Sequence, residues 1–320
     1  MTCETPAIRA DQLGKDFGSL CAVRSVDLLI PAGSVFALLG PNGAGKTTTV
    51  RLLSTLLRPD RGRAEVFGYD VVRQPTAVRS MIGITGQYAS LDDNLSAREN
   101  LMIFGMLLGW SGRMATRRGD ELLEQFELGH AATRPVRTLS GGMRRRLDIA
   151  TTLLGSPPLI FLDEPTTGLD PHTRIGMWDT VRTMVARGST VLLTTQYLEE
   201  ADALADRIAI IDDGTVVAEG TADELKSSIG GAVLRIRLRD GDRRGEAVDV
   251  LRRITAAQPS VSALDGEITT ALSDVDRVTD VLVALRGHDI ALEHMTVDRP
   301  DLNEVFLTIT GNPIQTEELA

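Results

Sequence analysis

Lysine is nearly absent from this 320-residue chain, which contains only Lys15, Lys46 and Lys226. Arginine supplies the rest of the 34 basic residues, and 44 acidic residues bring the net charge at pH 7 to −10. Proteins that bind nucleic acid generally present a basic face, so this balance argues against a nucleic-acid partner. In so arginine-rich a chain, a lysine in a motif suggests a need for its compact point charge.

Cysteine and long apolar runs are also scarce. Cys3 and Cys21 do not form a spacing typical of a metal or redox site, so we interpret them as reduced thiols. The longest apolar stretch, 101–110, is about half of what a membrane-spanning helix needs. Residues 1–12 show no signal-peptide pattern. If the protein serves a membrane, we expect another chain to supply the spanning part.

A glycine-rich run lies between the apolar segment 35–39, a predicted buried strand, and a helix predicted over 48–57. It fits the phosphate-binding pattern G-x-x-x-x-G-K-[ST], the P-loop. Its residues are Gly40, Pro41, Asn42, Gly43, Ala44, Gly45, Lys46, Thr47 and Thr48. The glycines let backbone N–H groups point at an anion, and the helix N-terminus adds a favourable dipole. Lys46 would reach the β- and γ-phosphates of ATP, and the Thr47 hydroxyl would ligate Mg²⁺.

Two acidic residues, Asp163 and Glu164, follow a second apolar run, 159–162, which also predicts a buried strand. Strands often end in acids, so the pair is a weak signal alone and becomes strong only after a P-loop. Asp163 is placed to hold Mg²⁺ opposite Thr47. Glu164 is placed to orient and deprotonate an attacking water.

Ser140, Gly141 and Gly142 precede a predicted helix that runs to Leu153. In isolation, an ordinary helix N-cap is the simpler interpretation. Functionally, the serine and two exposed glycine amides would make a second anion site. One P-loop in a monomer has no obvious use for a second γ-phosphate site, whereas two monomers packed head to tail do. We therefore predict a homodimer in which each serine-glycine loop covers the ATP held by the other subunit.

The pattern changes at Gly230 and Gly231, which predict a hinge or boundary. Beyond them we expect strands and helices in the order β-α-β-β-α-β, which matches a ferredoxin-like plait. The strands are predicted over 233–238, 261–264, 268–272 and 290–297, and the helices over 246–254 and 275–285. A closing helix is predicted over 302–309. The predicted domains are thus an ATP-binding domain, 1–228, and a C-terminal accessory or regulatory domain, 229–320, without a visible catalytic constellation.

These motifs resemble, in order, those of the ATP-binding subunits of ABC transporters. The matching segments are 40–48, Gln87, 139–143, 159–164 and 168–170. The resemblance implies an α/β P-loop NTPase fold over about residues 4–225, with a RecA-like core, an antiparallel β subdomain and a helical subdomain. Further similarity in 140–146, 194–202 and 299–307 points to the daunorubicin/doxorubicin-resistance subfamily and covers nearly the whole chain.

The resemblance also implies roles for single residues. Phe17 occupies the position of the aromatic residue that stacks on adenine. Gln87 would touch the metal and face the membrane subunit, and Asp170 would couple the two sites across the dimer. Met143 and Gln196 depart from the family pattern, which commonly has Gln and His at these positions. A Gln196 amide can still donate a hydrogen bond to the γ-phosphate, but it cannot carry a proton charge.

The implied function is ATP hydrolysis in an exporter. Two copies would sandwich two Mg-ATP, and an integral-membrane permease on separate chains would export a hydrophobic drug-like compound from the cytoplasmic face of the membrane. Another cargo, such as lipid or polysaccharide, stays open because the absent subunit chooses it. A non-transport ATPase acting on ribosomes or DNA is disfavoured by the single cassette without a heptad insertion. A regulator without turnover is disfavoured by the intact Lys46 and Glu164.

Two other features have bland and functional interpretations. Arg144, Arg145 and Arg146 could contact a partner or phosphate, but a helix face that is solvated or paired with acids is the simpler interpretation. The apolar segment 101–110 is expected to be mostly core. A minority of it could form a groove for a cytosolic helix of the membrane partner, because exposed apolar patches mark interaction sites.

Overall fold

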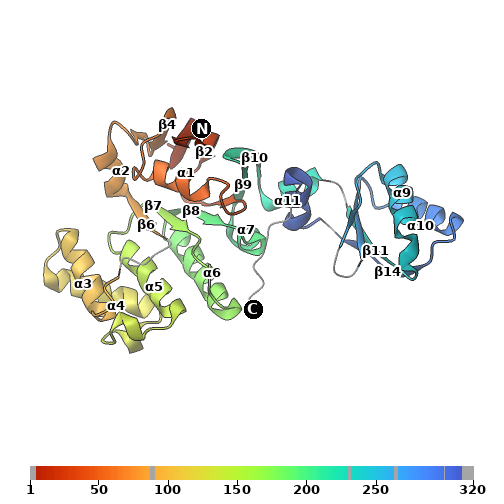
Figure 1. Cartoon of the computed structure of the whole chain (residues 1–320). Coiled ribbons are helices and arrows are strands. Elements are labelled where there is room, and N and C mark those ends of the chain that lie inside the picture. Colours follow the sequence, from red (N-terminus) through yellow and green to blue (C-terminus); the bar gives the residue numbers. More distant parts are fainter. Residues whose placement is uncertain (1–4, 87–90, 230–231, 263–265, 299, 312–320) are drawn as a thin grey trace. The chain divides into compact units, whose positions relative to one another are not determined.

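The computed structural model describes residues 5–86, 91–229, 232–262, 266–298 and 300–311 (Figure 1). Contacts between Cα atoms divide the chain into two compact units, the first ending at Glu219 and the second beginning at Gly220. Helix α8 (Ala222–Ser228) therefore belongs to the second unit. The domain boundary at 228 stays a prediction. No helix in the described ranges is long and apolar enough to cross a membrane.

A single large sheet organises the first unit. Its order over the described residues is β5-β4-β1-β2-β10-β9-β3-β8-β7-β6. The strands are β1 (Ile8–Phe17), β2 (Leu20–Ile30), β3 (Val35–Leu39), β4 (Arg61–Val66), β5 (Tyr69–Asp70), β6 (Ile82–Thr85), β7 (Leu159–Asp163), β8 (Thr190–Thr195), β9 (Arg207–Asp212) and β10 (Thr215–Gly220). Strands β9, β3, β8, β7 and β6 pair in parallel, whereas β2, β1, β4 and β5 pair antiparallel.

Burial explains the apolar runs in the sequence. Every residue of β3, β7 and β8 is buried, as expected for parallel strands covered on both faces. The antiparallel strand β2 alternates between buried and more exposed residues along much of its length, because one face is solvated. The carboxyl ends of β3, β7 and β8 meet at one edge of the sheet, so the loops that follow them lie together there.

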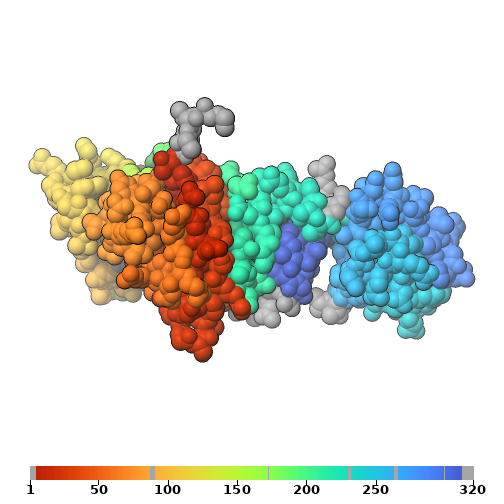
Figure 2. Space-filling view, turned by 90° about the horizontal axis from the view of Figure 1, so that it is seen from above, coloured from red at the N-terminus to blue at the C-terminus, as the bar shows by residue number. Residues whose placement is uncertain are grey.

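The helices of the first unit fall into two groups, of which one forms a separate helical layer. Helices α3 (Ala97–Leu107), α4 (Gly112–Gln125) and α5 (Gly141–Thr152) contact one another, and α5 contacts β6 (Figure 1). In the space-filling view, this layer (yellow for α3 and α4) and the N-terminal antiparallel strands (red) occupy different parts of the surface (Figure 2). The other helices are α1 (Lys46–Leu53), α2 (Pro75–Met81), α6 (Pro171–Ala186) and α7 (Leu198–Leu204), and the short 3-10 turns are Gly129–Ala131 and Val136–Thr138. The predicted α/β fold, with an antiparallel β layer and a helical layer, is confirmed.

Two sequence expectations need correction here. The helix predicted to run to residue 57 ends at Leu53, because Thr55 takes the left-handed backbone conformation with φ of 66°. The apolar segment 101–110 is not mostly core. Only Leu101 and Gly105 in it are buried, while Leu107 is 77% exposed.

The second unit has a four-stranded antiparallel sheet in the order β12-β13-β11-β14 over the described residues. The strands are β11 (Ala232–Leu238), β12 (Ser260–Val261), β13 (Ile268–Leu272) and β14 (Leu292–Asp298). Helices α9 (Arg244–Thr255) and α10 (Arg277–Gly287) pack apolar side chains such as Leu251 and Val281 against Leu234 and Ile236 of β11. The β-α-β-β-α-β order predicted for a ferredoxin-like plait is confirmed.

The remaining elements of the second unit are short. A 3-10 turn, Gly241–Arg243, precedes α9, and the closing helix α11 (Leu302–Thr310) contacts α8. Arg235 of β11 donates hydrogen bonds to Asp298 and to Glu304 of α11, which ties the closing helix to the sheet. Gly230 and Gly231, the predicted hinge, lie outside the described residues.

Candidate active site

The P-loop connects the buried strand β3 to helix α1, the context that the motif requires. Gly45, the N-cap of α1, has a φ of 103°, and a Cβ there would lie 2.5 Å from the Ala22 carbonyl oxygen of β2. A Cβ on Gly40 would lie 2.3 Å from the Ile211 carbonyl oxygen of β9. Larger residues at these two positions would displace the loop. The glycines therefore set both its curvature and its close contact with neighbouring strands.

Lys46 lies within this loop with its side chain only 3% exposed. Its Nζ donates to the carbonyl oxygens of Gly40 (2.7 Å) and Pro41 (3.0 Å) and lies 3.7 Å from Glu164 Oε1. Burial lowers the pKa of Lys46, and the negative charges of Glu164 and Asp163 act in the opposite direction. The loop therefore holds a buried ammonium group whose present partners are two backbone carbonyls and one carboxylate. An anionic ligand would be a stronger partner than the carbonyls.

Asp163 is held from two sides. Thr47 Oγ1 at the start of α1 donates to Asp163 Oδ1 at 3.1 Å, and Thr194 Oγ1 on β8 donates to the same oxygen at 2.6 Å. The parallel register places Thr194 directly opposite Asp163. Hydroxyl and carboxylate oxygens are the ligands that Mg²⁺ prefers, so Thr47 and Asp163 fit a shared magnesium site.

Glu164 directly follows β7 and has a φ of 49°, a backbone conformation that non-glycine residues rarely adopt. Its N–H donates to Thr194 Oγ1 (3.0 Å) and to the Thr194 carbonyl (3.1 Å). Its carboxylate accepts from Thr167 Oγ1 at 3.3 Å and faces Lys46. One buried hydroxyl, that of Thr194, thus binds the Asp163 carboxylate and the Glu164 backbone. The sequence analysis did not assign a role to Thr194, although its place near the end of an apolar strand was a signal for one.

Comparison with known proteins shows the family to which this chain belongs. A family model described as ABC transporter matches residues 23–167. The chain is 50% identical to the daunorubicin/doxorubicin resistance ATP-binding protein DrrA of Streptomyces peucetius, over 100% of this chain and 98% of that protein. It belongs to the ABC transporter ATP-binding subunits. It is therefore an ATP-hydrolysing subunit of a transporter.

Two other similarities bear on fold and cargo. The chain is 37% identical to the Nod factor export ATP-binding protein I of Cupriavidus pinatubonensis, over 97% of this chain and 93% of that protein. The dimeric post-hydrolysis structure of the ATP-binding cassette MJ0796, bound to ADP and Pi, matches 67% of this chain and 98% of that one. That match has a TM-score of 0.61 and 27% sequence identity. An ABC cassette of this kind binds nucleotide.

The ABC signature loop, residues 139–143, leads into α5. Ser140 is the N-cap of this helix, and its hydroxyl accepts from Met143 N at 3.3 Å, so the cap interpretation is confirmed. Ser140 and Gly141 are also exposed, and a Cβ on Gly141 would meet open space. Among the described contacts, none joins these two residues to the P-loop of their own chain. A role against a second subunit's nucleotide stays a prediction.

Gln196, at the position where the family pattern commonly has His, follows directly after β8 and is half-buried. The N-cap of the next helix, α7, is Tyr197, whose N–H donates to Thr195 Oγ1 at 2.9 Å. Because Gln196 does not cap that helix, its amide is left to other partners.

Asp170 caps α6, where its carboxylate accepts from the N–H (3.0 Å) and the hydroxyl (2.6 Å) of Thr173. Coupling across a dimer is not visible in one chain, so that role of Asp170 stays a prediction.

The residue predicted to stack on adenine, Phe17, lies at the end of β1 with 46% of its surface exposed. Lys15 Nζ lies 5.6 Å from the centre of its ring. The neighbouring strand β2 touches the P-loop at Ala22, so an exposed ring here suits a base beside the phosphate site. Stacking on adenine stays a prediction. Gln87, predicted to touch the metal, lies outside the described residues.

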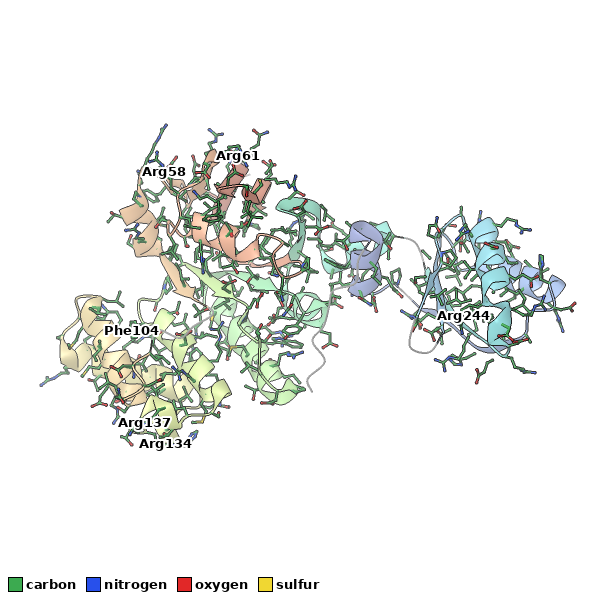
Figure 3. All side chains as sticks on the ribbon, viewed as in Figure 1. Arg58, Arg61, Phe104, Arg134, Arg137 and Arg244 are labelled. Carbon is green, nitrogen blue, oxygen red and sulfur yellow. The ribbon has the colours of Figure 1, made fainter. Side chains whose placement is uncertain are left out.

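The three consecutive arginines after Met143 have partners. Arg144 pairs with Asp93 at 2.7 Å and Arg146 pairs with Glu127 at 3.2 Å, as the simpler interpretation expected. Arg145 differs, since it points into the protein toward the ends of β6 and β7. The apolar Phe104 lies on α3, and the arginines Arg134 and Arg137 lie in the segment between α4 and α5 (Figure 3).

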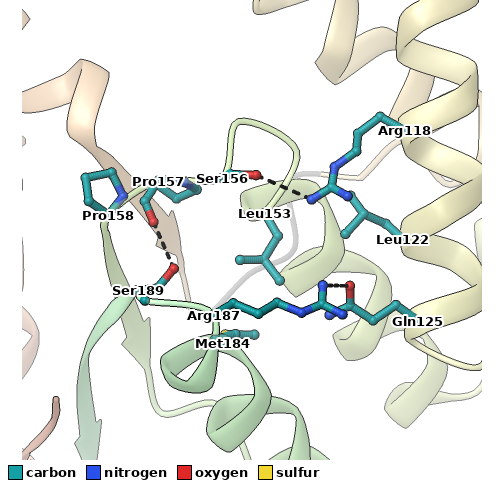
Figure 4. A pocket seen from close by; sticks show the side chains of 11 residues that line it. Arg118, Leu122, Gln125, Leu153, Ser156, Pro157, Pro158, Met184, Arg187 and Ser189 are labelled. Atoms are coloured by element: carbon teal, nitrogen blue, oxygen red, sulfur yellow. Dashed lines mark hydrogen bonds between the residues drawn. The ribbon is translucent and has the colours of Figure 1, made fainter. Parts of the chain in front are cut away.

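A separate hollow of about 270 Å³ lies between α4, the segment after α5 and the end of α6. Arg118 donates to Ser156 Oγ, and Arg187 donates to Gln125 Oε1 within it (Figure 4). None of its lining residues belongs to the P-loop, to the signature loop or to the acid pair. The hollow is therefore separate from the residues predicted to bind the nucleotide.

Proposed function

We propose that this chain energises the export of hydrophobic, drug-like compounds, as a homodimer bound to a separate integral-membrane permease at the cytoplasmic face of the membrane. The observation that carries the ATPase part is the meeting of Lys46, Thr47, Asp163 and Glu164 at one edge of the sheet. The drug-export part is supported by the full-length similarity to a daunorubicin/doxorubicin resistance protein.

The site residues divide the chemistry among themselves. Lys46 exchanges its carbonyl partners for the β- and γ-phosphates, because a charge-assisted bond to phosphate is stronger. Thr47, Asp163 and Gln87 would hold Mg²⁺, which neutralises charge on the phosphates when bound. Glu164 accepts a proton from the water that attacks the γ-phosphorus, while the bond from that phosphorus to the ADP oxygen breaks. Thr194 holds the Asp163 carboxylate and the Glu164 backbone in place during this step.

The dimer is supported by what the single chain leaves exposed. Ser140 and Gly141 present a hydroxyl, backbone N–H groups and a helix N-terminus to the outside, a favourable place for a phosphate. The P-loop has no such cover among the described contacts of its own chain. Two copies arranged head to tail would complete both sites.

The permease contact is supported by the exposed apolar end of α3. Met106, Leu107 and Leu108 are 49%, 77% and 53% exposed, and such an apolar patch suits a partner helix. The cargo itself would be chosen by the permease. A Nod factor exporter subunit is 37% identical, so a cargo other than a drug is the second candidate.

The dimer can be tested with two defective variants. Lys46→Ala damages the P-loop and Ser140→Arg damages the signature loop, so a mixed dimer should contain one intact composite site. We expect the mixture to regain ATPase activity that neither variant shows alone. The isolated chain should also show activity that rises more steeply than its concentration. Strict proportionality at all concentrations would contradict the shared site.

Drug export is tested in cells that express the chain with the membrane protein encoded beside its gene. We expect these cells to accumulate less doxorubicin than cells carrying Lys46→Ala in place of the wild-type chain. Equal accumulation in both, with normal ATPase activity of the wild type, would reject doxorubicin as cargo. The ATPase assignment would stand in that case.

A further inference from the structure

Arg145 is the one of the three consecutive arginines that is directed inward. Its side chain is 13% exposed, compared with 38% for Arg144 and 24% for Arg146. The acids that pair with its neighbours, Asp93 and Glu127, are themselves 51% and 86% exposed. Such exposed ion pairs contribute little to the stability of the fold. Arg145 has a different set of partners, and most of them are backbone carbonyls.

Two hydrogen bonds tie the Arg145 guanidinium to the backbone beside the acid pair. Its Nε donates to the Pro165 carbonyl at 3.1 Å, and its Nη2 donates to the Asp163 carbonyl at 3.0 Å. The Glu164 carbonyl lies 3.4 Å from the same Nη2. The guanidinium therefore spans the three residues where β7 ends and the proposed base begins. These carbonyls are bound where Glu164 takes its left-handed conformation.

A third bond reaches a different segment. Nη1 donates to the carbonyl of Gly86 at 2.7 Å, immediately after β6 and immediately before Gln87. The same nitrogen lies 3.4 Å from Asp148 Oδ2, one turn along α5, and the Asp148 side chain is 6% exposed. Burial lowers the pKa of Arg145, and the charge of Asp148 acts in the opposite direction. A rigid fork with five N–H donors can serve these carbonyls together, which an ammonium cannot do.

Helix α5 is the element through which such a link matters. It begins at the signature loop and contacts α3 and α4 of the helical layer as well as β6 of the sheet. Arg145 lies on its second turn, five residues after Ser140. A displacement of α5 would move the guanidinium, and with it the carbonyls of Gly86, Asp163 and Pro165.

We propose that Arg145 is a positioning residue that couples α5 and its signature loop to the backbone of Asp163 and Glu164 and to Gly86, the residue after β6. It touches no reacting atom. It makes the alignment of the base and of Gly86 depend on the position of α5. This inference rests on the proposed function in taking Glu164 as the base.

The test compares Arg145→Lys with Arg144→Lys and Arg146→Lys in the full chain. Each change keeps the charge and removes the planar fork. We expect the kcat for ATP hydrolysis to fall about tenfold in Arg145→Lys, the effect of losing hydrogen bonds from a charged group. The KM for ATP should change less than about twofold, because the P-loop contacts of Lys46 are untouched. The two control variants should keep kcat within about twofold of the wild type.

A second variant separates positioning from folding. Arg145→Ala leaves a cavity shaped for a guanidinium ion, so millimolar guanidinium chloride should raise its kcat, whereas Arg144→Ala should not respond. A purely structural role would lower the melting temperature and would give no such rescue. Wild-type kcat in Arg145→Lys, or loss of kcat in Arg145→Ala without rescue, would overturn the inference.

Glu164→Gln is measured alongside these variants. Activity in that variant would reject the proposed base and with it that part of the proposed function. The kcat of Arg145→Lys still tests the positioning role, because Arg145 binds the backbone at the end of β7 whether or not Glu164 is the base. The two failures are therefore distinguishable.

Discussion

The two units of this molecule differ in the polar side chains that they bury. In the described part of the second unit, Thr255 and Thr270 are the buried polar residues, and their hydroxyls hydrogen-bond to each other at 3.2 Å. The first unit buries charged side chains as well. These are Lys46, Asp148, Asp163 and Glu200. Burying a charge is costly unless it is well paired, and two of these four residues, Lys46 and Asp163, belong to the candidate active site. The second unit is organised by apolar packing.

The largest effect that would sharpen this contrast is expected at Glu164. Glu164→Gln keeps the shape of the side chain and removes its basicity, so turnover should fall by about 10²-fold or more while ATP still binds. Steady-state ATPase and nucleotide-binding assays check this. Glu199→Gln, on an exposed part of α7, is the matched control and should behave as wild type. Near-normal turnover in Glu164→Gln would remove this residue as the base.

A smaller effect is expected at Thr194. Thr194→Val removes the hydroxyl that binds Asp163 and accepts from Glu164 N–H, so turnover should fall about tenfold. Thr194→Ser keeps the hydroxyl and should restore most of the activity.

The control for Thr194 comes from the second unit. Thr255→Val also removes a buried, hydrogen-bonded hydroxyl, and it should lower stability by about 1 kcal/mol while leaving turnover per folded molecule unchanged. Equal loss of turnover in both valine variants would erase the contrast between the units.

Gln196 is expected to give a loss of a few-fold. Gln196→Ala should lower turnover about fivefold with little change in ATP affinity, because one neutral hydrogen bond is lost while the P-loop contacts remain. Gln196→His should retain activity and add a pH dependence between about 6 and 7, where imidazole titrates. Turnover of both variants across pH 5.5 to 8 checks this, and an unchanged alanine variant would exclude Gln196 from the site.

The smallest effect concerns stability alone. Glu200 is fully buried, and burial raises the pKa of its carboxylate above the ordinary 4.5. The folded state therefore holds this proton more tightly than the unfolded chain does. Stability conferred by protonation is lost as pH rises from 4.5 through the raised value.

Glu200→Gln removes this titration. Its melting temperature relative to the wild type should therefore rise between pH 5 and pH 8. Hydrogen bonds from Thr195, Thr166 and Trp178 oppose the shift, as does the positive charge of Arg174, which stacks on Tyr197 at 4.7 Å, so the gain should be modest. A melting-temperature difference that is constant with pH would contradict the assignment.

Local patterns predicted the parts of the site that local geometry builds. The P-loop was readable because its glycines, Lys46 and Thr47 are adjacent in sequence, and Asp163–Glu164 because they follow an apolar run. Thr194 and Arg145 were not readable in the same way. The role of Thr194 depends on the register between β7 and β8. The role of Arg145 depends on which of the three consecutive arginines of α5 is directed into the protein. Both features are set by the tertiary structure and not by the local sequence.

The same limit appears in the fold. Strand and helix order in the second unit followed from periodicity, whereas the end of α1 depended on the backbone of Thr55. The exposed part of segment 101–110 was underestimated, since apolarity alone does not distinguish core from contact surface.

The left-handed backbone at Glu164 has a consequence for how this protein can be improved. Only glycine, and to a lesser degree asparagine, adopts that conformation readily, and other residues there are strained by about 1 kcal/mol or more. Directed evolution for heat tolerance should therefore favour Glu164→Gly and Glu164→Asn, both of which lack the base. Variants selected for thermal stability alone would be enriched in proteins that do not hydrolyse ATP. Such a library therefore has to be selected for turnover at every round.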